Sequence, residues 1–226
     1  AILLNHPSEY QRKLLEDGYV IADFEQRKQV IHTATLQAAD NVGGTAVIND
    51  ALLEEITALN EWPVPITGNF DPRFLKLPAE VLITTMQVNQ KYFAVTDKNK
   101  KLLPNFITFS NIESTNPQAI KEGNERVILP RLGDAEFFWK QDRHSKLSER
   151  TPDLANIIFQ KTLGTLLDKT QRLEALTAYL STALEIAPEH NCRAALLAKT
   201  DLITEMVGEF PSLQGVMGRY YALADH

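Results

Sequence analysis

The first sixty residues carry apolar side chains at the spacing of a helix. Ile31, Ala34, Ala38 and Val42 follow one another at steps of three and four residues, which gathers them on one helical face. Trp62–Pro65 then forces extended chain, because a residue before proline avoids the helical region. With capping residues and glycines as boundaries, the pattern predicts three helices, over about residues 7–18, 23–43 and 50–59.

The middle of the chain changes from helical spacing to short β-rich runs. Pro78 opens another helix that reaches Met86, since proline suits the first helical turn. Two runs rich in aromatic and β-branched residues follow, Tyr92–Val95 and Phe106–Phe109, and the polar segment Asp97–Lys101 separates them. This arrangement is typical of a β-hairpin.

Helical spacing returns from Pro117 onward. Pro130 either kinks this helix or starts a new one, because it lacks the backbone N–H that a helix interior uses. After Thr151-Pro152-Asp153, apolar residues from Leu154 to Leu180 recur at steps near three and four, and a further helix extends from Pro188 through Met206. The predicted fold class is α+β: a mixed region with a helical start and a small β-containing middle over residues 1–150, then an all-helical module over residues 151–226.

Composition describes an ordinary globular protein. The 226 residues are 44% hydrophobic and 23% charged, with a net charge of −6, which argues against disordered and collagen-like classes. The chain contains neither an apolar stretch long enough for a bilayer nor a signal peptide, so we expect a cytoplasmic location and no membrane partner. Cys192 is the single cysteine, which excludes an internal disulfide. A start without methionine and an end just after a hydrophobic run indicate a fragment of a longer protein.

Common catalytic motifs are absent from the sequence. It contains no Walker phosphate loop, no Gly-x-Gly-x-x-Gly, no Gly-x-Ser-x-Gly and no His-Glu-x-x-His, which are the usual signatures of nucleotide binding and hydrolysis. The five histidines are scattered, with no two at the spacing of ligands on one helix. We therefore expect neither catalytic residues nor a metal site in this chain.

Residues 124–139 combine charged and aromatic side chains in one short block. Arg126 and Arg131 offer guanidinium groups that suit phosphates, and Lys91 with Tyr92 adds an ammonium group and a ring for base stacking. These four residues are candidates for nucleic-acid binding. The alternative is a solvated helix face whose aromatic residues, Phe137–Trp139, belong to the core.

Many short runs along the chain are shared with one family. They include Glu61-Trp62-Pro63, Gln90-Lys91-Tyr92-Phe93, Leu103-Pro104-Asn105-Phe106, Asn111-Ile112-Glu113-Ser114, Gly123-Asn124-Glu125-Arg126-Val127, Pro130-Arg131-Leu132, Asp134-Ala135-Glu136-Phe137-Phe138 and Gln214-Gly215-Val216-Met217-Gly218. Through these runs the chain resembles the β subunit of the bacterial heterotetrameric glycyl-tRNA synthetase over most of its length. It departs from the family pattern at Leu129, where a basic residue is expected, and at Gly133, where alanine is common.

The resemblance implies an interior piece of the β subunit. In that family the α subunit carries the class II catalytic core, so ATP and magnesium are expected there and no cofactor in this chain. The β subunit supplies modules that bind tRNA. Residues 1–150 resemble part of the editing-type domain of the phenylalanyl-tRNA synthetase β chain, and residues 151–226 resemble a truncated HD-type domain. The implied partners are tRNA(Gly), the α subunit and the remainder of β.

The comparison with HD-type enzymes can be followed residue by residue. If Lys169–Arg172 occupies the place of the first His-x-x-Arg, and Ala195–Lys199 the helix ending in His-Asp, then Lys169, Ala198 and Lys199 replace metal ligands. A lysine ammonium has no lone pair for a metal. The resemblance thus implies a metal-free scaffold in which Lys169, Arg172 and Lys199 contact phosphate; the alternative for each is a solvated surface charge. We expect Asp201 to pair with Lys199 or to cap a turn.

These observations favour a non-catalytic part of the glycyl-tRNA synthetase β subunit. Its expected role is to bind tRNA(Gly) and support the α subunit during ATP-dependent attachment of glycine. Two alternatives stay open: a hydrolase module of the HD or editing type, and a purely structural spacer.

Overall fold

The computed structural model describes residues 2–225, which form two compact units. The first extends to Gly133 and the second begins at Asp134. The division lies inside one helix, and the domain boundary expected at residue 150 stays a prediction.

The first unit begins with the three predicted helices, preceded by a 3₁₀ turn, Pro7–Glu9. The side chain of Asp23 accepts a hydrogen bond from the Gln26 N–H and Asn49 from the Ala51 N–H, so polar residues start the second and third helices as expected. The three helices are α1 (Tyr10–Gly18), α2 (Phe24–Asn41) and α3 (Asp50–Leu59).

A four-stranded antiparallel sheet follows, in the order β1-β3-β4-β2. The strands are β1 (Thr45–Val47), β2 (Val64–Asn69), β3 (Phe93–Thr96) and β4 (Leu102–Ser110). The predicted hairpin is confirmed as β3 and β4, and the Asp97 carboxylate accepts hydrogen bonds from two backbone N–H groups in its turn. Sequence reasoning missed β1 and gave β2 only as extended chain. Pro65 fits β2 because that strand is at the edge of the sheet.

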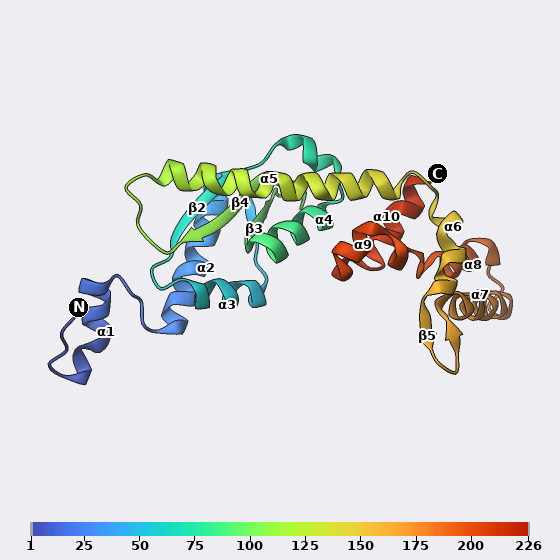
Figure 1. Ribbon diagram of the computed structural model, residues 1–226, viewed down its shortest axis with the longest axis horizontal. Coiled ribbons are helices and arrows are strands. Elements are labelled where there is room, and N and C mark those ends of the chain that lie inside the picture. Colours follow the sequence, from blue (N-terminus) through green and yellow to red (C-terminus); the bar gives the residue numbers. More distant parts are fainter. Residues whose placement is uncertain (1, 226) are drawn as a thin grey trace. The chain divides into compact units, whose positions relative to one another are not determined.

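The two faces of the sheet pack differently. Phe93, Val95 and Ile107 belong to the buried cluster that also contains side chains of α2 and α3. On the opposite face Tyr92 stacks on Phe106, with ring centroids 4.4 Å apart. Figure 1 shows β2, β3 and β4 between the α2–α3 pair and α5 (Pro117–Asp142). Side chains alternate between these faces as a pleated strand requires.

Short helical elements connect β2 to β3. They are η2 (Pro72–Lys76), α4 (Ala79–Thr84) and the π-helical turn η3 (Thr85–Asn89). Pro130 lies inside α5, so the alternative in which it starts a new helix is wrong. Its missing N–H removes one hydrogen bond from the helix interior. Burial of Ile128, Leu132 and Ala135 on one face offsets that loss and keeps the helix continuous.

The second unit contains a short hairpin that the sequence did not predict. Residues Ile158–Gln160 and Gly164–Thr165 pair as β5 and β6, so the all-helical description of this region is wrong. Gly164 has φ +84°, a conformation that glycine adopts readily, and the Thr165 and Asp168 side chains form a capping box. These features delay the start of α7 to Leu166.

Helices make up the rest of the second unit. They are α6 (Leu147–Arg150), η4 (Thr151–Asn156), α7 (Leu166–Ala183), α8 (Pro188–Leu197), η5 (Thr200–Ile203), α9 (Glu205–Glu209), η6 (Pro211–Leu213) and α10 (Val216–Ala224). The helix expected from Pro188 through Met206 stops at Leu197. Thr204 caps α9 separately through the Val207 N–H, so α8, η5 and α9 replace one long helix. Among residues 2–225, none of the helices combines the length and apolar character that crossing a bilayer requires.

Candidate functional site

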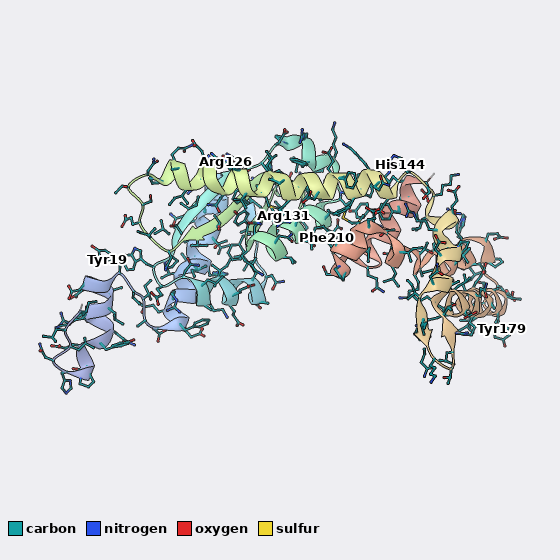
Figure 2. The ribbon with its side chains drawn as sticks, in the orientation of Figure 1. Tyr19, Arg126, Arg131, His144, Tyr179 and Phe210 are labelled. Carbon is teal, nitrogen blue, oxygen red and sulfur yellow. The ribbon has the colours of Figure 1, made fainter. Side chains whose placement is uncertain are left out.

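Arg126 and Arg131 lie on α5 with their side chains exposed (Figure 2). Within residues 2–225 neither makes an ion pair or a side-chain hydrogen bond. The neighbouring carboxylate of Glu125 has other partners: it accepts a hydrogen bond from the Asn69 N–H at 2.8 Å and lies 3.8 Å from the Lys121 ammonium. The two arginines therefore present uncompensated positive charge to solvent.

The aromatic residues beside them do not all join the core. Phe137 is 59% exposed, so the alternative that assigns Phe137–Trp139 to the core is wrong for this residue. Trp139 stacks on Tyr221 with centroids 5.2 Å apart, and Arg143 lies over the same indole ring at 5.1 Å. The block 124–139 thus combines an exposed charged face with only a partly buried aromatic side.

Lys91 and Tyr92 have partners inside the first unit. The Lys91 ammonium is 3.0 Å from the Glu55 carboxylate. Tyr92 is only 3% exposed, and its hydroxyl donates to Asn124 Oδ1 at 2.7 Å. Burial raises the pKa of Tyr92 to about 12. Its ring faces Phe106, so in this arrangement it is not available for stacking on a base.

Lys169 and Arg172 both contact the β5–β6 hairpin from α7. The Lys169 ammonium lies 3.8 Å from the centroid of the Phe159 ring, a cation–π contact. The Arg172 guanidinium donates to the Leu163 carbonyl at 3.0 Å. The structure brings these two candidates to the same hairpin, and Lys199 lies directly before η5.

A basic cavity in the second unit was missed by sequence reasoning. It has a volume of 310 Å³ between α8 and α10, and its lining includes His190, Arg193 and Arg219. No aspartate or glutamate is among the described residues that line it. The signal was present in part, because His190, Arg193 and Leu197 recur at helical spacing, but the pairing of α8 with α10 is not visible in the sequence.

Two buried carboxylates of the second unit bind backbone groups. Asp201 accepts hydrogen bonds from the N–H groups of Gly215 and Gly218, which also line the cavity. A Cβ on Gly218 would approach the Asp201 carboxylate to 3.2 Å. Asp201 therefore holds the start of α10 through N–H groups 14 and 17 residues along the chain, a role that the sequence did not predict.

Asp142 makes a comparable network. Its carboxylate accepts from the Glu205 and Met206 N–H groups at 2.9 and 3.0 Å and from the Tyr221 hydroxyl at 2.6 Å. Burial, followed by this hydrogen bond, raises the pKa of Tyr221 well above its usual range. Asp142 thus fixes the start of α9 and its contact with α10. Residues 2–225 hold no group of three or more His, Cys, Asp or Glu side chains that could bind a metal ion.

Comparison with known proteins places the chain in a family. The family model described as glycyl-tRNA synthetase beta subunit matches residues 1–226. Similar curated proteins named glycine–tRNA ligase beta subunit occur in Coxiella burnetii, 51% identical over 99% of this chain, and in Hahella chejuensis, 51% identical over 97% of it. The chain spans 32% of each of these relatives, about a third of their length. On this evidence, the chain belongs to the glycyl-tRNA synthetase β-subunit family.

Proposed function

We propose that this chain is a non-catalytic, tRNA-binding part of a glycyl-tRNA synthetase β subunit. The carrying observation is that Arg126 and Arg131 are exposed without a carboxylate partner in the described residues. Free guanidinium groups suit phosphate oxygens, which they bind through two parallel hydrogen bonds. Such contacts fix the register of a protein on its nucleic acid.

The second unit adds further positive charge to this proposal. The cavity between α8 and α10 is lined in part by Arg219, whose guanidinium group suits a phosphate oxygen. Lys169, Arg172 and Lys199 stay candidates for phosphate contacts, although the first two already bind the hairpin. Lys91 and Tyr92 also stay in the proposal. In this arrangement, however, Lys91 pairs with Glu55 and Tyr92 is buried.

In the complete enzyme, the proposed partners are tRNA(Gly), the α subunit and the remainder of the β subunit, in the cytoplasm. ATP and magnesium belong to the active site proposed for α, so this chain would act by positioning tRNA for glycine attachment. An HD-type or editing-type hydrolase and a structural spacer are the alternatives. A tRNA-binding role differs from a spacer role in one measurable way, because only the first requires that residues of this chain change the affinity of the enzyme for tRNA.

The test is tRNA(Gly) binding by the assembled α–β enzyme over a salt series. Variants Arg126→Ala and Arg131→Ala are compared with Arg12→Ala, whose exposed guanidinium is already paired with Glu16 at 3.1 Å. If each arginine neutralises one phosphate, the slope of log K against log salt falls by about 0.7–0.9 per variant. Unchanged affinity and slope in both variants, with Arg12→Ala also unchanged, would refute the proposal for α5.

A further inference from the structure

The first unit contains a cavity whose chemistry differs from that of a phosphate site. Its volume is 660 Å³, and it lies between the end of α1, the start of β2 and the segment that follows β4. Two of the runs shared with the family, Glu61-Trp62-Pro63 and Asn111-Ile112-Glu113-Ser114, supply much of its lining. None of the described lining residues is lysine, arginine or histidine.

Aromatic rings form part of the wall. Tyr19 and Trp62 meet edge to face, with centroids 5.3 Å apart and ring planes at 90°. Tyr19 is 60% exposed (Figure 2), and its φ of +53° places it in the left-handed region. A bulky side chain adopts that conformation only when its surroundings hold it there. The exposed ring is thus fixed by its backbone and by Trp62.

The backbone around the aromatic pair is also held in place. Asn111 Oδ1 accepts hydrogen bonds from the N–H groups of Glu61 and Trp62 at 2.7 and 2.8 Å. The Ile21 N–H donates to the Glu61 carbonyl at 2.9 Å, which connects the segment after α1 to the segment that precedes β2. The cavity is therefore preformed by contacts between segments that are distant in the sequence.

Two carboxylates at this cavity lack internal partners. Glu61 and Glu113 are both exposed, and within residues 2–225 neither side chain makes an ion pair or a hydrogen bond. Aromatic faces beside carboxylates attract cations through the ring quadrupole and through charge-assisted hydrogen bonds. Phosphate groups would be repelled, because the described lining offers no positive side chain.

We propose that this cavity binds an arginine- or lysine-bearing polypeptide segment from the part of the β subunit that lies outside this chain. The space exceeds one side chain and suits a short peptide segment. The relatives extend well beyond the matched region, since this chain spans 32% of their length, and a segment of the same polypeptide is present at high effective concentration. The inference rests on family membership and on charge complementarity, and it does not depend on tRNA binding.

The test uses the full-length β subunit assembled with α. A photo-crosslinking amino acid replaces Ile112, a lining residue that is 63% exposed, and mass spectrometry identifies the crosslinked peptide. We expect a peptide of the same β chain, outside the region matched by this sequence, that contains arginine or lysine. A crosslink to the α subunit or to tRNA, or no crosslink, would overturn the proposal.

A charge variant separates specific binding from chance proximity. In the crosslinking protein, Glu61→Gln with Glu113→Gln is expected to lower the yield of that peptide about tenfold, because charge-assisted hydrogen bonds are lost. The matched control, Glu189→Gln with Glu209→Gln, removes the same charge from exposed positions in the second unit and should leave the yield unchanged. An equal fall in both double variants would contradict a specific role for Glu61 and Glu113.

Discussion

Replacing Asp142 with alanine is expected to destabilise the second unit strongly. Three donors lose their acceptor: the N–H groups of Glu205 and Met206 and the hydroxyl of Tyr221. Glu205 is exposed, so water can accept the hydrogen bond of its N–H. Met206 is fully buried and Tyr221 is only 3% exposed, so their donors are left without an acceptor. Each of these two buried donors costs about 1–3 kcal/mol when it is left without an acceptor, which gives a total of about 2–6 kcal/mol.

The assay is urea unfolding followed by tryptophan fluorescence. The chain has two tryptophans, Trp62 in the first unit and Trp139 in the second. Because Trp139 stacks on Tyr221, a Trp62→Phe background leaves a probe placed next to the network. The expected result is a lower midpoint for Asp142→Ala, from which the loss in unfolding free energy follows.

Two further variants calibrate this measurement. Tyr221→Phe removes one donor and keeps the two backbone contacts of Asp142, so a loss of about 1 kcal/mol is expected. Asp153→Ala removes an exposed carboxylate of the same unit and should change stability by less than about 0.5 kcal/mol. If Asp142→Ala cost no more than Asp153→Ala, the argument from buried unpaired donors would be refuted.

Three other changes probe particular contacts. Gly68→Ala should destabilise the first unit by about 1–3 kcal/mol, because its Cβ would lie 2.2 Å from Phe106 Cζ; an unshifted Trp62 unfolding midpoint would contradict this. The Thr165 N–H and hydroxyl hold the pKa of Asp168 below its ordinary value of 3.8, so its contribution is present above that value and is lost as pH falls through the lowered pKa. Asp168→Asn should therefore weaken the acid dependence of urea unfolding, and an unchanged dependence would count against it. Lys169→Ala should lower the free energy of opening the β5–β6 hairpin by about 0.5–1 kcal/mol, which hydrogen exchange of the hairpin amides measures. Equal protection of these amides in both proteins would show that the Lys169–Phe159 contact does not stabilise the hairpin.

Local rules predicted the elements whose boundaries depend on nearby residues. Asp23 and Asn49 start helices through hydrogen bonds that reach two or three residues along the chain. Asp97 organises the β3–β4 turn in the same way. These contacts are legible in the sequence because both partners are neighbours.

The β5–β6 hairpin was missed because its apolar spacing imitates a helix. Leu154, Ile157 and Ile158 recur at steps of three and one, yet Leu154 is fully buried while Ile158 is 76% exposed. The deciding features are the positive φ of Gly164 and the reciprocal bonds of Thr165 and Asp168. Periodicity does not measure them, although the Thr-x-x-Asp spacing was a visible sign of a helix start.

The partners of the charged candidate residues could not be predicted from the sequence either. From the sequence alone, four positive side chains are equally good candidates for phosphate binding, because their partners in the folded chain are not visible: Lys91, Lys169, Arg126 and Arg131. Folding brings Glu55 to Lys91 and Phe159 to Lys169, while α5 leaves Arg126 and Arg131 unpaired within the described residues. Binding phosphate through either lysine would have to replace an existing contact, whereas the arginines need only lose water. The tRNA-binding proposal therefore depends most directly on the two arginines, where a loss of affinity can be measured without a loss of internal structure.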